Sequence, residues 1–92
     1  MDKAAEGIFN GEDTKTARRA CPSSIWRTAR RKLDMINAAA ELSDLKSPPG
    51  NELKALQKER KGQHAIRIND QYRICFRWTH EGAEDVEVTD YH

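Results

Sequence analysis

Apolar and polar residues alternate along the C-terminal third of the chain, and this alternation predicts β-strands. The apolar side chains fall on even-numbered positions, namely Ile66, Ile68, Tyr72, Ile74, Phe76, Trp78, Val86 and Val88. The odd-numbered positions include Arg67, Arg73, Cys75, Arg77, Glu87, Thr89 and Tyr91. We expect three strands, roughly 63–68, 72–79 and 84–91, joined by hairpin-compatible turns at 69–71 and 80–83. One face of this sheet is then apolar, and the other carries arginines.

The length of the first turn decides which residues face each other across the first hairpin. A three-residue loop pairs Ile68 with Tyr72 and keeps the apolar side chains on one face, whereas a two-residue loop would pair Ile68 with Gln71 and mix the faces. With the three-residue loop, Arg67 lies directly opposite Arg73, and like charges in that position are destabilising. Either the two arginines are separately hydrated, or they hold a phosphate that supplies the missing negative charge.

Apolar residues at helical spacing mark the middle of the chain. Ile25, Ala29, Leu33, Ile36 and Ala40 recur at this spacing and predict a helix over about residues 24–41. Its expected N-cap is Ser23, with Ser24 as the alternative. The arginines on its other sides, Arg27, Arg30 and Arg31, are expected to form a solvated face.

Shorter elements are predicted on either side of this helix. Residues 1–10 carry apolar side chains on one face and predict a short helix that ends at Asn10-Gly11. Residues 12–22 are polar and basic, which is typical of a loop. Two prolines and a glycine exclude a helix or a central strand at 47–51, and residues 53–56 form a possible short strand.

Helices that precede an antiparallel sheet and cover its apolar face predict an α+β architecture. We expect two N-terminal helices packed on one face of a small, mainly antiparallel sheet, in a single domain over residues 1–92. Trp26, Tyr72 and Trp78 are expected in the core and not as platforms for base stacking.

Composition narrows the classes of function. Hydrophobic residues make up 37% of the chain, charged residues 34%, and the net charge is only +1, so a general nucleic-acid coat is not indicated. A basic middle with acidic ends favours a local anion site. No secretory signal or membrane-spanning run is present. Cys21 and Cys75 lack metal or redox spacing and are expected to be free thiols in a reducing cytoplasm.

Four segments together resemble a known family. They are Arg-Lys-Leu-Asp-Met-Ile (31–36), Ser-Pro-Pro-Gly-Asn-Glu-Leu (47–53), Gly-Gln-His-Ala-Ile-Arg-Ile-Asn-Asp-Gln-Tyr-Arg-Ile-Cys-Phe-Arg-Trp (62–78) and Val-Glu-Val-Thr-Asp-Tyr-His (86–92). Over about residues 4–92 the chain closely resembles the HigB toxins of the RelE/ParE superfamily of type II toxin–antitoxin systems. Relatives usually begin with a short strand, and Met1-Asp2-Lys3 starts inside that pattern, so the first strand is expected to be missing.

The resemblance implies a small cytoplasmic bacterial toxin with a RelE-like fold. Such toxins cleave mRNA in the ribosomal A site, where the RNA 2′-hydroxyl attacks the adjacent phosphate and the 5′-oxygen leaves, without a metal or other cofactor. A HigA-like helix-turn-helix antitoxin neutralises them, and the pair usually represses its own operon, so operator DNA is contacted through the antitoxin complex. No membrane partner is expected.

The resemblance also implies roles for particular residues. Arg73 matches the arginine that contacts the scissile phosphate. Tyr91 and His92 match the terminal pair placed at the active site, with Asp90 beside them. Lys54 stands where some relatives carry a catalytic histidine. Basic positions near the RNA path are matched by Arg60, Lys61, His64 and Arg67, and Lys58 joins them from the same charged turn.

Cleavage at a 2′-hydroxyl needs a proton acceptor, a proton donor and stabilisation of the phosphate charge. His92 is the first candidate for proton transfer, Arg73 for phosphate binding and Lys54 for a second positive charge. Tyr91 could orient the phosphate, stack on a base or assist proton transfer, and Asp90 either orients His92 or only ends the strand.

The roles of two further histidines, His64 and His80, are considered separately. His64 is equally compatible with the edge of the core and with RNA contact, and His80 is expected to be a solvated turn residue. The three histidines have no recognisable zinc-ligand spacing, so no metal site is predicted.

Three functions remain open. The first is a ribosome-dependent mRNA endoribonuclease, the second a ParE-like inhibitor of DNA gyrase, and the third an inactive RNA-binding relative. The terminal Asp-Tyr-His sequence and Arg73 favour the endoribonuclease, because gyrase inhibition needs no proton-transfer pair.

Overall fold

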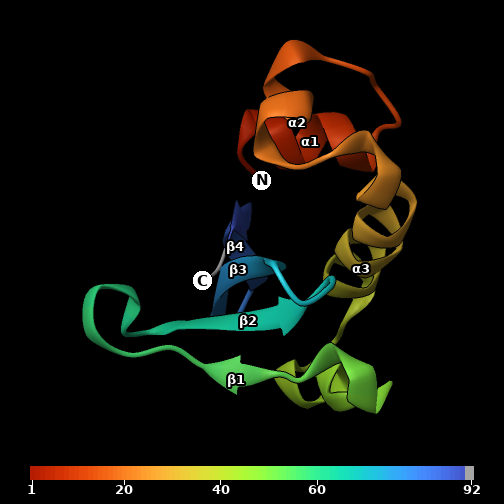
Figure 1. The fold of residues 1–92 in the computed structure, drawn as a ribbon. Helices are drawn as coiled ribbons and strands as arrows, with labels where there is room; N and C mark the ends of the chain where they lie inside the picture. The colour runs from red at the N-terminus through yellow and green to blue at the C-terminus, as the bar shows by residue number, and fades with distance from the viewer. Residues whose placement is uncertain (91–92) are drawn as a thin grey trace.

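The computed structural model describes residues 1–90, in which helices come first and an antiparallel sheet follows (Figure 1). The helices are α1 (Lys3–Phe9), α2 (Lys15–Ala20) and α3 (Trp26–Ala38). The strands are β1 (Lys54–Ala55), β2 (Gln63–Arg67), β3 (Tyr72–Thr79) and β4 (Gly82–Asp90), in the spatial order β1-β2-β3-β4. Short 3₁₀ turns connect them: η1 (Ser23–Ile25), η2 (Leu42–Lys46), η3 (Pro49–Asn51) and η4 (Lys58–Arg60). The predicted α+β fold is confirmed.

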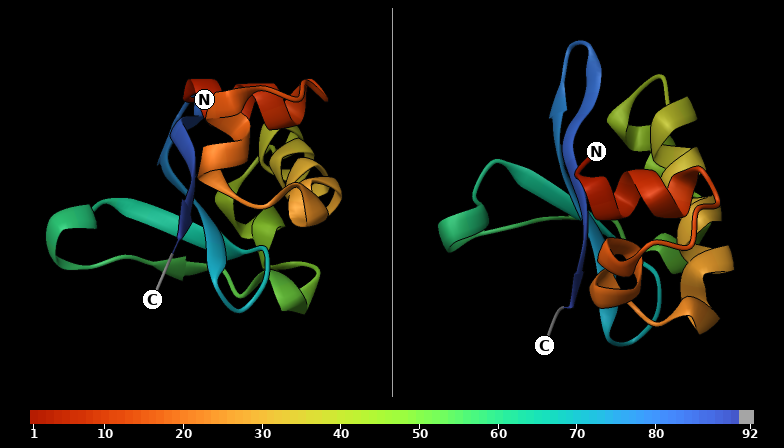
Figure 2. Two further views of the ribbon diagram at one scale, coloured as in Figure 1. Left: turned by 45° about the horizontal axis from the view of Figure 1, so that its top comes forward. Right: turned by 90° about the horizontal axis from the view of Figure 1, so that it is seen from above.

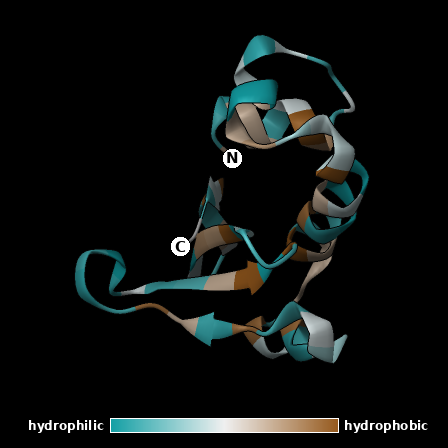
Figure 3. Cartoon of the chain, viewed as in Figure 1, coloured by the Kyte–Doolittle hydropathy of each residue, from teal (hydrophilic) through white to brown (hydrophobic). Residues whose placement is uncertain are grey.

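The helices lie together on one side of the β3–β4 hairpin (Figure 2). The even-numbered strand residues point toward them, and Ile66, Ile74 and Phe76 are fully buried in one core with Ile8 of α1 and Leu33 of α3. Hydrophilic residues dominate the connection between β1 and β2, which projects from the sheet (Figure 3). Trp26, Tyr72 and Trp78 pack against the core while partly exposed, as expected.

The register of the first hairpin is the one predicted from the apolar–polar alternation and the three-residue loop. Arg67 pairs with Arg73, and the N–H of Ile68 donates to the carbonyl of Tyr72 at 2.9 Å. The Asn69 side-chain oxygen accepts from the N–H groups of Gln71 (2.9 Å) and Tyr72 (2.7 Å), so this asparagine fixes the turn locally.

The long helix is shorter than the sequence predicts. Ser23 does not cap α3, because Ser23 begins the 3₁₀ turn η1 and α3 starts at Trp26 without a side-chain cap. The predicted end near residue 41 is also wrong, since Ala39 is already extended. Asp44 accepts the N–H groups of Ala40 and Glu41, each at 3.0 Å, and this capping of η2 turns the chain away.

The prediction of a loop at 12–22 is wrong where α2 forms. The Thr14 hydroxyl accepts from the N–H of Ala17 at 3.0 Å and caps this helix. Ala17 is its buried residue, and a Cβ added at Gly7 of α1 would lie 3.7 Å from the Ala17 Cβ. The two short helices therefore stabilise each other by close packing. Because α2 has only six residues and buries Ala17, its sequence shows no repeating apolar pattern that would predict a helix.

The last strand starts earlier than predicted. Thr79 pairs with Gly82, so only His80 and Glu81 form the turn and β4 begins at Gly82 instead of residue 84. A register shift between Cys75 and Arg77 accompanies the left-handed Asp85 (φ 53°) and restores the apolar face at Val86. Along residues 1–90, no helix is both long and apolar enough to cross a bilayer.

Candidate anion-binding site on the polar sheet face

The middle of the polar sheet face has small side chains on its two central strands. Lys54, Ala65, Cys75 and Glu87 lie in one row across the four strands, because each pairs with the next in the strand register. Ala65 (0% exposed) and Cys75 (1%) are covered by Leu56, which forms a small second core with them. The chain segment that follows Leu56 is thereby held over the polar face of the sheet.

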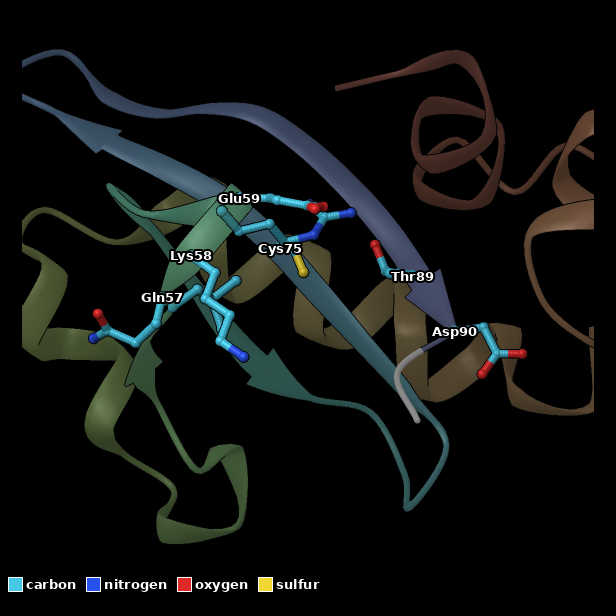
Figure 4. A pocket seen from close by; sticks show the side chains of 8 residues that line it. Gln57, Lys58, Glu59, Cys75, Thr89 and Asp90 are labelled. Carbon is cyan, nitrogen blue, oxygen red and sulfur yellow. The ribbon is translucent and has the colours of Figure 1, made fainter.

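A hollow of about 520 Å³ lies between this segment and the end of β4 (Figure 4). It is lined by Leu56, Gln57, Lys58, Glu59, Arg60, Cys75, Thr89 and Asp90. In the close view Cys75 lies between the side chains of Gln57 and Lys58 and those of Thr89 and Asp90. Asp90 is oriented by Gln71 of the first hairpin turn, whose amide nitrogen donates to its Oδ2 at 3.1 Å.

Arg67 and Arg73 form the next row, and a carboxylate lies between them. Oε2 of Glu52 is 3.4 Å from Nε of Arg67 and 3.4 Å from Nη1 of Arg73. Arg67 also pairs with Asp70 in the hairpin turn. From the register alone, the two arginines were either separately hydrated or held a phosphate. In the structure, Glu52 of the chain itself supplies a negative charge between them.

The backbone at Glu52 is anchored by its buried neighbour. Asn51 is fully buried, accepts a hydrogen bond from the Lys32 ammonium and donates to the Leu45 carbonyl at 3.1 Å. Glu52 follows in the left-handed conformation, with φ 46° and ψ 51°. Burial lowers the pKa of Lys32, and the positive charges of Arg31 and Arg67 lower it further.

The η4 turn is tied to the sheet by Arg60. Its guanidinium lies 2.6 Å from Glu87 of β4 and donates to the Gln63 side-chain oxygen at 3.1 Å. Lys58 has a left-handed backbone (φ 57°), and both Lys58 and Lys61 are exposed. This part of the chain can present ammonium groups to an anion beside the sheet.

Most of the predicted site residues come together on this face. Lys54, Arg67 and Arg73 lie in adjacent rows, and the hollow is lined by Lys58, Arg60 and Asp90. Lys61 lies at the end of η4. Tyr91 and His92, the candidates for proton transfer, lie outside the described residues.

His64 lies on the opposite face of the sheet. It pairs with Phe76, and the two rings stack with centroids 6.3 Å apart and an interplanar angle of 25°. Its Nδ1 is buried and lacks a hydrogen-bond partner within residues 1–90. This is the placement that the core-edge alternative requires, and the RNA-contact alternative remains a prediction.

The arrangement suits anion binding more than metal binding. Arginine guanidinium groups bind phosphate oxygens in bidentate fashion, and two of them lie side by side here. Within the described part of the chain, no group of three or more His, Cys, Asp or Glu residues could hold a metal ion. Both cysteines are free and buried, and burial raises the pKa of the Cys21 thiol although a hydrogen bond with Trp26 opposes this.

The site also contains residues that were not predicted for it from the sequence. Odd-numbered strand positions carry the arginines, and they also carry Cys75, Glu87 and Thr89. The alternation therefore places these three side chains on the same face as the arginines. Glu52 had no such signal, because it follows the Pro-Pro-Gly-Asn turn and lies 21 residues from Arg73. Its position depends on how residues 47–53 fold against α3.

The chain is similar in sequence to known proteins along most of its length. The model of a family described as RelE-like toxin of type II toxin-antitoxin system HigB matches residues 1–92. Toxin HigB-1 of Vibrio cholerae serotype O1 is 46% identical over 77 residues, which span 84% of this chain and 78% of that protein. An uncharacterized protein of Haemophilus influenzae is 40% identical over 57 residues, or 62% of this chain and 56% of that protein.

Proposed function

This chain belongs to the HigB family of RelE-like toxins of type II toxin–antitoxin systems, and we propose that it is an mRNA endoribonuclease that cleaves in the ribosomal A site. The observation that carries the proposal is the pairing of Arg67 with Arg73 beside the end of β4. Two guanidinium groups on adjacent strands offer a phosphodiester a rigid set of donors, and Arg73 pairs with Thr89 near the end of β4. We further propose that residues 1–92 form one toxin domain that acts in the bacterial cytoplasm.

In the proposed reaction the RNA 2′-oxygen attacks the adjacent phosphorus and the 5′-oxygen leaves. The 2′-hydroxyl proton goes to a base, and the leaving oxygen receives a proton from an acid, so no metal is required. We assign these transfers to His92 with Tyr91, and we assign to Asp90 the orientation of His92. Gln71 supports this assignment, because it holds the Asp90 carboxylate at 3.1 Å.

The positive charges of the polar face stabilise the phosphorane in this scheme. Arg73 contacts a non-bridging oxygen, and its side chain is only 16% exposed, so it is held in place before RNA arrives. Lys54 lies one row away and adds a second positive charge. A pre-positioned charge needs little reorganisation during the reaction, which is the main advantage of such a site.

The exposed cations around η4 are proposed to follow the RNA strand. Lys58, Arg60 and Lys61 stand beside the hollow or at the end of η4, and Arg67 lies in the next row. Phosphate contacts of this kind position the strand without reading its sequence. Codon preference would then depend on the ribosome and on contacts made by residues other than these cations.

Membership of a type II system implies an antitoxin partner, and we propose a HigA-like helix-turn-helix protein. Operator DNA would be bound through the complex of the two proteins. Co-expression with a HigA-like antitoxin should restore growth and yield a complex that shifts operator DNA, whereas the isolated toxin should not shift it.

Induced expression followed by primer extension on a cellular mRNA tests the activity. Cuts that require translation, and that Arg73→Ala and His92→Ala abolish, support the endoribonuclease. Arg19→Ala is the matched control, because Arg19 is an exposed residue of α2 that does not line the hollow. DNA damage without mRNA cuts would favour gyrase inhibition, and unchanged growth with intact mRNA would favour an inactive RNA-binding relative.

A further inference from the structure

We propose that Glu52 is a built-in counter-anion of the phosphate site, which an RNA phosphate must displace before it can bind Arg67 and Arg73. The inference rests on the proposed function only for the identity of the incoming anion, an RNA phosphodiester. It assigns to Glu52 control over how strongly the site binds RNA.

The contact between the Glu52 carboxylate and the two arginines has the geometry expected of a bridging group that another anion can replace. A single oxygen, Oε2, lies 3.4 Å from both Nε of Arg67 and Nη1 of Arg73. Both distances exceed the 2.7–2.9 Å of a strong charge-assisted hydrogen bond. A phosphate has several oxygens and can make shorter bidentate contacts with the same guanidinium groups.

The two sides of this contact differ in freedom of movement. The side chains of Arg67 and Arg73 are 31% and 16% exposed, whereas that of Glu52 is 55% exposed. The arginines are therefore the fixed part of the site, and the carboxylate can rotate into solvent. Because Asn51 anchors the backbone next to Glu52, only side-chain rotation is needed.

The surrounding charges explain why an anion is retained. Arg67 and Arg73 are directly opposed, and the field of Arg67 reaches Lys32, where it contributes to the lowered pKa of that ammonium. Asp70 offsets part of the Arg67 charge from the hairpin side. Within residues 1–90, the Glu52 carboxylate forms ion pairs with both arginines.

Displacement exchanges one monoanion for another. A phosphodiester carries a single negative charge, so the site keeps its net charge when the Glu52 carboxylate leaves. The exchange lowers the net gain from RNA binding, and only a phosphate held by further contacts displaces Glu52 efficiently. This favours RNA that another surface already positions, as the ribosomal A site would.

Binding of RNA that cannot react tests the proposal directly. The probe is a short 2′-O-methyl RNA, which has no 2′-hydroxyl nucleophile, and binding is followed by fluorescence anisotropy at fixed ionic strength. Glu52→Gln should bind it about two- to tenfold more tightly than the wild type, as expected for the loss of two competing ion pairs. Glu52→Asn, which tolerates the left-handed backbone, should also bind it more tightly.

Two controls separate a local effect from net charge. Glu12→Gln changes the net charge equally, but lies in the α1–α2 connection at the far end of the molecule from β1, and should leave affinity unchanged (Figure 1). In an Arg73→Ala background, the gain from Glu52→Gln should shrink. Equal gains from Glu12→Gln, or an undiminished gain without Arg73, would overturn the specific contact.

Thermal unfolding with inorganic phosphate provides a second readout. Without phosphate, Glu52→Gln should unfold at a lower temperature than the wild type, because the two opposed arginines lose the negative charge that they share. Added phosphate should raise the unfolding temperature more in this variant than in the wild type. An equal rise in both proteins would overturn the proposal.

The outcome is distinguishable from failure of the proposed function. Tighter binding by Glu52→Gln, combined with no mRNA cleavage by the wild type, would leave the counter-anion role intact and refute the nuclease. If the wild type cleaves mRNA while Glu52→Gln loses cleavage without tighter binding, then Glu52 takes part in the chemistry and the counter-anion role is refuted.

Discussion

The Lys32 ammonium donates a hydrogen bond to the Asn51 side-chain oxygen, and both residues are buried although they lie 19 positions apart. This bond joins α3 to the 3₁₀ turn η3, which precedes the first strand of the sheet. Asn51 also donates to the carbonyl of Leu45 at 3.1 Å and to that of Ser47 at 3.4 Å. One amide thus satisfies several buried polar groups and places Glu52 beside the arginine pair.

Asn51→Ala should therefore lower the free energy of unfolding by about 2 to 3 kcal/mol, because it leaves a buried ammonium and a buried carbonyl without their partner. Urea unfolding followed by tryptophan fluorescence measures the loss. Asn37→Ala, at an exposed position of α3, should change the value by less than about 0.5 kcal/mol. Equal losses in both variants would argue against a special role for Asn51.

The buried Lys32 should make stability depend on pH. Its pKa is lowered from 10.5 in the folded protein, so between the lowered value and 10.5 the unfolded chain binds more protons than the folded one. The free energy of unfolding should therefore rise with pH across that window, relative to Lys32→Met. Below the lowered pKa both states are protonated, and the difference between the two proteins should be constant.

The comparison with Lys32→Met also removes the contribution of Cys21. Burial raises the pKa of that thiol from 9.0, so its effect on stability has the opposite sign and is lost as pH rises through the raised value. Both proteins contain Cys21, and its effect cancels in their difference. Urea titrations at several pH values between 8 and 10.5 test this, and parallel pH profiles would contradict a shifted Lys32.

Arg73→Lys should reduce mRNA cleavage by about 10- to 100-fold, because lysine keeps the charge but cannot make the bidentate contact with phosphate. Arg77→Lys is the matched control, since Arg77 lies on the same strand and pairs with Asp85 at the other end of β3. Initial cleavage rates on translated mRNA measure both effects. Full activity of Arg73→Lys would show that charge alone suffices at this position.

Thr14→Ala should lower the free energy of unfolding by about 1 kcal/mol, because the threonine hydroxyl caps α2. Thr16→Ala, at an exposed position inside the same helix, lacks a capping role and should be neutral or slightly stabilising. The two variants are compared by urea unfolding. Equal destabilisation would mean that the Thr14 cap contributes little.

Local rules were sufficient for the hairpin and for much of the polar face. The register that places Arg67 opposite Arg73 follows from a period of two and a three-residue loop, and both are visible without tertiary contacts. The same alternation puts Cys75 and Thr89 beside the arginines. The basic residues of the hollow were also predicted, although Tyr91 and His92 lie outside the described residues.

Local rules failed where a segment depends on its neighbours. The α2 helix has one buried residue, Ala17, and is stabilised by packing against α1, so no apolar period predicts it. Ser23 is a suitable cap in sequence terms but begins a 3₁₀ turn, while the Trp26 indole donates to the carbonyl of Cys21 at 3.1 Å. Such competition between caps, turns and packing is decided only in the folded chain.

By itself the sequence determined the α+β class, the antiparallel register and the opposed arginines, because alternation and loop length are local properties. Only the tertiary structure decided that a carboxylate lies between those arginines. Glu52 is 21 residues from Arg73, and its place depends on a buried lysine–asparagine bond to α3. Strand pairing therefore brings the two arginines together, whereas the packing of α3 against η3 places the Glu52 carboxylate between them.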